Sequence, residues 1–137
     1  MEWEGRAEIL LVAADWRSRT LLLAELQEAG YDVVALPSLE VALAALAGGR
    51  LSPALVILDT QGDPDASPRR IGQLVNLLEE DVPLVLIVGV YDARTLASLR
   101  ERVALWLSRP LRVGDVLTAM RRIGFPPPRK VGGPPGL

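Results

Sequence analysis

The chemistry open to this chain is limited by the residue types that it lacks. Its 137 residues include no cysteine and no histidine. This excludes disulfides, thiolate metal sites and cysteine nucleophiles, and it removes the commonest general base and zinc ligand. Any site must therefore use carboxylates, hydroxyls or cationic side chains. Three such residues, Asp15, Asp59 and Arg109, each stand at the end of a short apolar run, which is where sites form in α/β proteins.

Five short apolar runs predict the buried strands that must position these residues. They cover residues 8–13, 31–36, 54–58, 84–88 and 103–107. Helices are expected over 16–29, 38–47, 71–78, 92–102 and 112–123, with Asp15, Ser38 and Asp92 as N-caps. Strands that alternate with amphipathic helices imply right-handed crossovers and a parallel sheet. The predicted fold is α/β: a five-stranded parallel sheet, (βα)5 and doubly wound, in a flavodoxin-like three-layer sandwich.

One folded domain is expected over residues 1–124, followed by a linker or disordered tail over 125–137 that is rich in proline and glycine. A hydrophobic content of 50% excludes a disordered chain. The sequence predicts neither a membrane span nor a signal peptide, so a cytoplasmic location is expected. The net charge is −2 and the arginines are scattered, so direct nucleic-acid binding by this domain is not expected. The terminal linker fits either a fragment of a longer protein or a stand-alone domain.

Four local motifs at matching spacing resemble those of one known family. They are the strand that ends at Asp59, the strand 82–88 with its leading proline, the segment 106–111 around Arg109, and the helix-to-strand junction 28–33. On these motifs the sequence, from residue 8 to about 123, resembles the receiver domain of bacterial two-component response regulators. The resemblance implies phosphorelay signal transduction, with Asp59 in the place of the phospho-accepting aspartate.

The sequence departs from this family at the positions around the acceptor. The acid pair that binds Mg²⁺ in the family corresponds to Ala13 and Ala14, and Asp15 matches the next position, which usually caps the helix. The family's switch hydroxyl corresponds to Val88 and its lysine to Arg109. The pocket that the resemblance implies is therefore lined by Ala13, Ala14, Asp15, Val88, Gly89 and Arg109.

Two interpretations of Asp59 stay open. It is either a retained phospho-acceptor or a strand-end acid that pairs with Arg109, whose guanidinium would fill the space left by the missing acids and lysine. Because Mg²⁺ is normally held by carboxylates, no cofactor is expected unless phosphorylation is retained. Asp15 and Asp59 are then the only candidate metal ligands.

The sequence therefore predicts an atypical receiver domain, a pseudo-receiver that is not an enzyme and in which Mg²⁺-dependent aspartyl phosphorylation is lost or weakened. Such a domain would act by protein–protein interaction with a kinase, an output domain, another regulator or a second copy of itself. The expected interaction face is built from the fourth helix, the fifth strand and the last helix, and several of its residues must also belong to the core. Its candidates are Leu96, Leu99, Trp106, Leu111, Val113 and Leu117.

Three other functions are left open. The first is a working phospho-receiver in which Asp59 accepts phosphate and Asp15 helps to hold Mg²⁺. The second is a receiver-like module that binds a small ligand between Ala13, Ala14 and Val88. The third is a small α/β enzyme, which the lack of histidine and cysteine disfavours. The partner, the pathway, the oligomeric state and any output domain beyond the proline-rich segment are not determined by the sequence.

Overall fold

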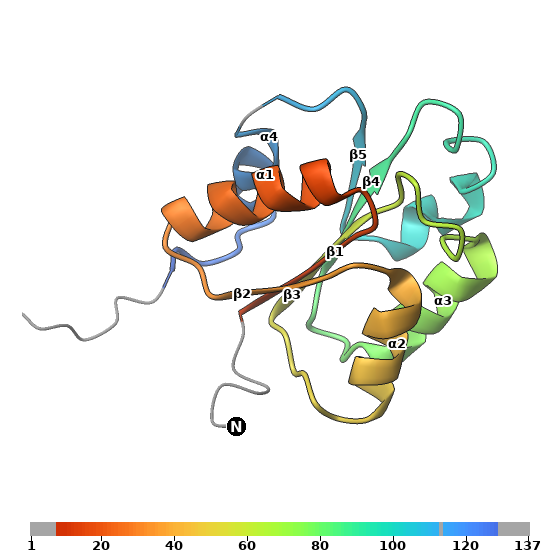
Figure 1. Cartoon of the computed structure of the whole chain (residues 1–137), viewed down its shortest axis with the longest axis horizontal. Coiled ribbons are helices and arrows are strands. Elements are labelled where there is room, and N and C mark those ends of the chain that lie inside the picture. The colour runs from red at the N-terminus through yellow and green to blue at the C-terminus, as the bar shows by residue number, and fades with distance from the viewer. Residues whose placement is uncertain (1–7, 113, 129–137) are drawn as a thin grey trace, which may run out of the picture.

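The computed structural model describes residues 8–112 and 114–128. One parallel sheet contains five strands: β1 (Ile9–Ala13), β2 (Val33–Leu36), β3 (Leu55–Asp59), β4 (Leu84–Val88) and β5 (Leu105–Ser108). The connections contain α1 (Trp16–Glu28), α2 (Leu39–Ala47), α3 (Pro68–Leu77), the 3₁₀ helix η1 (Ala97–Arg102) and α4 (Asp115–Arg122). This architecture, drawn in Figure 1, confirms the predicted α/β fold.

The strand order places a topological switch point at the carboxyl edge of the sheet. The order is β2-β1-β3-β4-β5, so the direction of winding reverses between β1 and β3. Ligand sites in open parallel sheets form at such a reversal, beyond the carboxyl ends of the strands. At that end of the sheet Ala13 of β1 is paired in register with Asp59 of β3, and Asp59 with Ile87 of β4.

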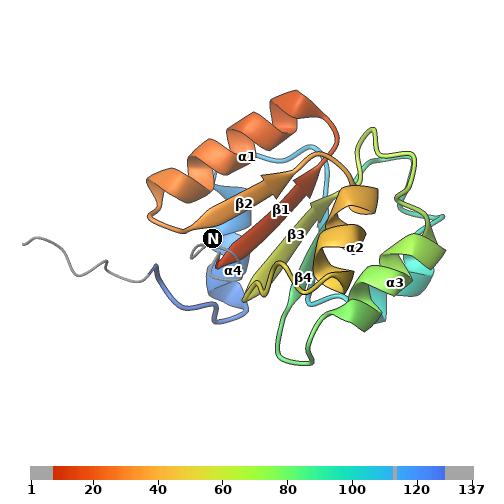
Figure 2. The same ribbon diagram turned by 60° about the horizontal axis from the view of Figure 1, so that its bottom comes forward.

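Two hydrophobic layers enclose the sheet. α1 and α4 cover one face, and α2, α3 and η1 cover the other (Figures 1 and 2). Successive side chains of a strand point to opposite faces, so Ile57 belongs to the same core cluster as Leu26 of α1, whereas Leu58 belongs to the cluster that contains Leu39 of α2. Every residue of β1, β3 and β4 is buried. Burial on both faces explains why these strands are continuous apolar runs in the sequence.

The main difference from the predicted elements lies between β4 and β5. The sequence predicts an α-helix over 92–102 that is capped by Asp92, whereas the structure has turns followed by η1. The carboxylate of Asp92 lies back against Gly89, where an added Cβ would come within 3.0 Å of Oδ2. No side chain caps η1, and its hydrogen bonds include Leu99 N to Leu96 O at 2.9 Å. This three-residue spacing defines the tighter 3₁₀ helix.

The other predicted elements are present with shifted ends. α1 and α2 begin directly after Asp15 and Ser38, whose side chains accept backbone hydrogen bonds at 3.3 and 3.2 Å, so both predicted N-caps are confirmed. β2 begins later than predicted, at Val33, and α4 begins at Asp115. Within the described ranges, no helix has the length and apolar content that crossing a membrane requires.

The first residues of the predicted tail pack against the domain. Phe125 lies on Tyr31 with ring centroids 5.8 Å apart, and the Tyr31 hydroxyl donates to the carbonyl of Pro126 at 3.0 Å. An added Cβ on Gly30 would lie 3.2 Å from Cγ of Pro128. Residues up to Pro128 thus contribute to packing at the end of α1. The remainder of the predicted tail, 129–137, falls outside the described residues.

Candidate functional site

Asp59 ends β3 at the carboxyl edge, next to the switch point between β1 and β3. Its side chain is fully buried, with 0% exposure. Residues two apart in a strand point to the same face of the sheet. The side chain of Asp59 therefore lies on the same face as those of Leu55 and Ile57, which is the face that α1 covers. Its Oδ1 accepts a hydrogen bond from the backbone N of Gln61 at 3.1 Å, and its Oδ2 accepts one from Nη2 of Arg109. These donors replace the hydration that a buried carboxylate loses.

Arg109 reaches Asp59 from the end of β5. Its backbone N donates to the carbonyl of Val88 at 2.9 Å, which extends the pairing of β4 and β5 by one residue. The guanidinium forms an ion pair with Asp59, and its side chain is only 22% exposed. The same Nη2 donates to Oγ of Ser18 at 3.0 Å. The ion pair that the sequence suggested as one interpretation of Asp59 is therefore present in the structure.

The hydrogen bonds around Asp59 close into a ring that joins three loops. Ser18, in the first turn of α1, accepts from Arg109 and donates to Oδ2 of Asp15 at 3.2 Å. Nε2 of Gln61 donates to the same oxygen at 3.3 Å, and the backbone of Gln61 bonds back to Asp59. We call Asp15, Ser18, Asp59, Gln61 and Arg109 the Asp59 ring. The sequence identifies three of its members, but Ser18 and Gln61 belong to no motif and are missed.

The end of β1 is bound by a second arginine. Nη1 of Arg19 donates to the carbonyl of Ala13 at 2.7 Å and to that of Ala14 at 3.4 Å. Ala13 itself is fully buried and paired with Asp59 in the sheet register. Where the family resemblance implies two acids, this chain therefore has two backbone oxygens that accept from a guanidinium. Sequence reasoning also misses Arg19, because a cation in the first turns of a helix is not a distinctive signal.

Val88 and Gly89, both predicted to line the pocket, contribute mainly through their backbones. The side chain of Val88 is fully buried among the core residues on the side of α2 and α3, whereas its carbonyl holds Arg109. Gly89 begins the next turn, in which its carbonyl accepts from the backbone N of Asp92 at 3.1 Å. The structure therefore does not bring the side chain of Val88 to the carboxylate of Asp59.

A further polar link connects α1 with the loop that follows β5. Oε1 of Glu25 accepts from the backbone N of Gly114 at 2.9 Å, and Gly114 is the N-cap of α4 without a capping side chain of its own. Burial raises the pKa of Glu25 above its usual value, and hydrogen bonds from the backbones of Gly114 and Leu117 oppose this rise. α1 is thus tied to this loop at both Ser18 and Glu25.

The predicted interaction face is divided between core and surface. Leu96 and Leu99 are only 2% and 3% exposed and hold η1 against the sheet. This part of the prediction is corrected, because side chains that are buried in the core cannot contact a partner. Trp106 and Leu111 are half-buried, and Val113 falls outside the described residues.

Comparison with known proteins finds similarity in structure. No family model and no curated protein matches the sequence. A response regulator receiver domain protein from Clostridium thermocellum has a TM-score of 0.71 at 16% identity, over 85% of this chain and 93% of that chain. The receiver domain of NtrX from Brucella abortus has 0.70 at 24% identity, over 84% and 96%. A CheY-like receiver domain protein from Methanospirillum hungatei has 0.67 at 22% identity, over 85% and 94%.

The match to a longer NtrX chain concerns only part of that protein. This chain covers 26% of the longer NtrX chain, at a TM-score of 0.71 and 24% identity. At these levels of identity the similarity is one of fold. The chain has the fold of response regulator receiver domains, as its motifs predict.

Proposed function

We propose that this chain is an atypical response-regulator receiver domain that acts in signal transduction by protein–protein interaction. It is not an enzyme in this proposal, and Asp59 is not phosphorylated in a Mg²⁺-dependent reaction. The receiver fold supports the role in signalling. The observation that carries the loss of phosphorylation is the buried ion pair between Arg109 and Asp59.

The hydrogen bonds of Asp59 oppose phosphoryl transfer. In phosphoryl transfer a carboxylate oxygen attacks the donor with a lone pair, which hydrogen bonding to a cation makes less nucleophilic, and the charge on the transferred group must be neutralised. Both oxygens of Asp59 are already bonded, one to Arg109 and the other to the backbone of Gln61, in a fully buried position. Removing one partner from a buried ion pair costs about 3–5 kcal/mol. That cost would add to the barrier for phosphorylation.

The side chains near Asp59 do not fit a divalent cation. Across residues 8–112 and 114–128, no three side chains of the types Asp, Glu, His and Cys lie close enough together to hold a metal ion. Asp15, the other acid of the Asp59 ring, is engaged as the N-cap of α1. The nearest cationic groups, on Arg109 and Arg19, would repel Mg²⁺. These features support a domain that works without a metal cofactor.

The partner is proposed to contact the surface around β5. β5 is an edge strand in the sheet order, so one of its sides is not covered by another strand. Trp106 of this strand is half-buried, and Cζ of Arg100 lies 5.1 Å from its ring centroid. Tryptophan and arginine are enriched among the residues that contribute most to binding at protein interfaces. A kinase, an output domain or a second copy of the chain is the proposed partner.

The proposed function is tested by the intact mass of the protein after incubation with acetyl phosphate and Mg²⁺. A receiver domain known to be phosphorylated is included in the same reaction, so that failure of the donor is recognised. We expect no phosphate on the wild type, because both Asp59 oxygens are engaged. A phosphate adduct on the wild type that is absent from Asp59→Asn would overturn the proposal and identify a working phospho-receiver.

A further inference from the structure

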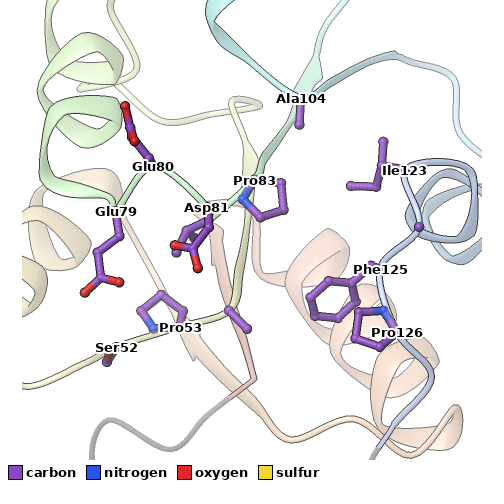
Figure 3. A pocket seen from close by; sticks show the side chains of 13 residues that line it. Ser52, Pro53, Glu79, Glu80, Asp81, Pro83, Ala104, Ile123, Phe125 and Pro126 are labelled. Atoms are coloured by element: carbon purple, nitrogen blue, oxygen red, sulfur yellow. The ribbon is translucent and has the colours of Figure 1, made fainter.

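A groove lies at the amino edge of the sheet, at the opposite ends of the strands from Asp59. Its volume is about 700 Å³, and it opens between the segments that precede β3, β4 and β5 and the segment that follows α4 (Figure 3). Three consecutive acidic residues, Glu79, Glu80 and Asp81, lie along one side, and in Figure 3 the carboxylate of Asp81 is nearest to the groove whereas that of Glu80 points away. We call it the amino-edge groove, and its apolar lining comes from Pro53, Pro83, Ala104, Ile123, Phe125 and Pro126.

The N-terminal segment of the chain begins at the rim of this groove. The carbonyl of Glu8 accepts from the backbone N of Ala54 at 2.9 Å and from that of Leu55 at 3.1 Å, and Ala54 lines the groove. Trp3 precedes Glu8 by five residues, a length of chain that spans up to about 16 Å when extended. The side chain of Trp3 can therefore reach the groove.

We propose that Trp3 docks in the amino-edge groove and that the N-terminal segment folds back across the start of β3. An indole has two broad apolar faces, which suit a lining of proline, isoleucine and phenylalanine, and one N–H that seeks an acceptor when it is buried. The carboxylates on one side of the groove offer such acceptors. None of them forms an ion pair with another described residue. Residues 1–8 carry Glu2, Glu4 and Glu8 beside a single Arg6, so the proposed docking rests on apolar contact and the indole hydrogen bond and not on attraction between charges.

The C-terminal segment is less suited to fill the groove. Pro126 lines it, but the carbonyl of this residue accepts from the Tyr31 hydroxyl at 3.0 Å, and Pro128 lies beside Gly30 at the end of α1. The chain thus turns from the groove toward α1 before it reaches Arg129. At the start of the described chain, in contrast, the backbone carbonyl of Glu8 bonds to the groove segment itself.

The docking of Trp3 is tested by its fluorescence in the full-length chain. Trp16 and Trp106 also emit, so the contribution of Trp3 is taken as the difference between the wild type and Trp3→Phe. We expect emission at shorter wavelength than that of free N-acetyltryptophanamide, and a lower constant for quenching by acrylamide. The groove lies at the opposite edge from the Asp59 ring, so this outcome is independent of the phosphorylation test.

A matched pair of substitutions decides where Trp3 is protected. Ala104 is exposed and lines the groove, so Ala104→Lys places a long charged side chain there. Ala44 is exposed on α2, away from the groove, and Ala44→Lys is the control. We expect Ala104→Lys to abolish the protection of Trp3 and Ala44→Lys to leave it unchanged. Circular dichroism checks that both variants fold. If Ala104→Lys does not fold, Ala54→Lys replaces it, since Ala54 is another exposed residue that lines the groove.

Three results would overturn intramolecular docking. One is quenching of Trp3 as strong as that of the free indole compound in the wild type. Another is protection that survives lysine in the groove. The last is protection that disappears on dilution together with a dimer seen by sedimentation, which would assign the groove to Trp3 of a second copy.

Discussion

The two edges of the sheet are held together by different forces. At the carboxyl edge, the Asp59 ring joins the loops that follow β1, β3 and β5 through hydrogen bonds between charged and polar side chains. At the amino edge, the segments that precede β3, β4 and β5 meet around apolar residues and leave the amino-edge groove. Phe125 packs against Tyr31 at this edge, with the two rings tilted relative to each other. The acids there, from Glu79 to Asp81, are exposed and solvated.

This difference explains why, among the described residues, a buried charge is found at the carboxyl edge and not at the amino edge. Asp59 can be fully buried because donors from two other positions converge on its two oxygens. The carboxylates of the amino edge have no such donors among the described residues and stay in water. Changes of charge should therefore act most strongly at the carboxyl edge, and changes of side-chain volume at the amino edge.

The largest effect is expected when the ion pair is broken. Arg109→Ala leaves the buried Asp59 without its cation, and the free energy of unfolding is expected to fall by about 3 kcal/mol. Urea denaturation at neutral pH measures this loss. The exposed Arg112 provides the matched control, since Arg112→Ala should change stability by less than about 0.5 kcal/mol.

The double variant Asp59→Asn with Arg109→Met separates charge from packing. It removes both charges while keeping most of the side-chain volume, so it should be clearly more stable than Arg109→Ala. If the double variant is as unstable as the single one, the arginine acts through its packing, and the contrast between the two edges fails.

A smaller effect is expected at the amino edge. Phe125 is half-buried, so Phe125→Ala should lower the free energy of unfolding by about 1–2 kcal/mol, less than the roughly 3–5 kcal/mol typical of a fully buried phenylalanine. Because the lost contact is apolar, the difference from wild type should not shrink at high salt, where exposed charges are screened. Phe125→Leu keeps most of the apolar volume and is the control. A loss that depends strongly on salt would contradict an apolar edge.

The smallest effect is expected at Glu25, which links α1 to the start of α4. Burial raises the pKa of Glu25 in the folded state, so its titration contributes stability that is present below the unfolded pKa and is lost as pH rises through the folded pKa. Glu25→Gln removes this dependence and keeps an acceptor for Gly114. Relative to wild type, the variant should gain stability as pH rises above about 4.5, by less than about 1 kcal/mol because Glu25 is partly exposed.

The pH dependence at Glu25 has a control on the same helix. Glu28 is exposed, and Glu28→Gln makes the same substitution on α1 at a position that does not bond to Gly114. Thermal unfolding from acid to neutral pH checks both variants. If the two glutamine variants behave alike, burial of Glu25 has no measurable effect on stability.

Much of the fold is encoded locally and could be predicted. A buried parallel strand must be apolar on both sides, so the runs around β1, β3 and β4 stand out in the sequence. The N-caps Asp15 and Ser38 are equally local signals, since each cap bonds to backbone two or three residues away. The segment before η1 misled the prediction because Asp92 resembles a cap in sequence, whereas its carboxylate lies against Gly89.

The candidate site was predictable only in part. Asp59 and Arg109 were found because each follows a strand, and the topology of a parallel sheet brings such ends to one edge. Ser18 stands 91 residues from Arg109, and Gln61 stands 46 residues from Asp15. Polar residues this far apart carry no mutual signal in one sequence.

By itself, then, the sequence determined the succession of strands and helices along the chain, and it identified Asp59 as the residue at the centre of a receiver-like site. Only the tertiary structure decided that both oxygens of Asp59 are engaged, that Arg19 binds the end of β1, and that Leu96 is core and not surface. The physical reason is the separation in sequence over which each interaction acts. Apolar spacing and capping act over a few residues, whereas closing a hydrogen-bonded ring or burying one face of a short helix depends on elements that meet only when the sheet has formed.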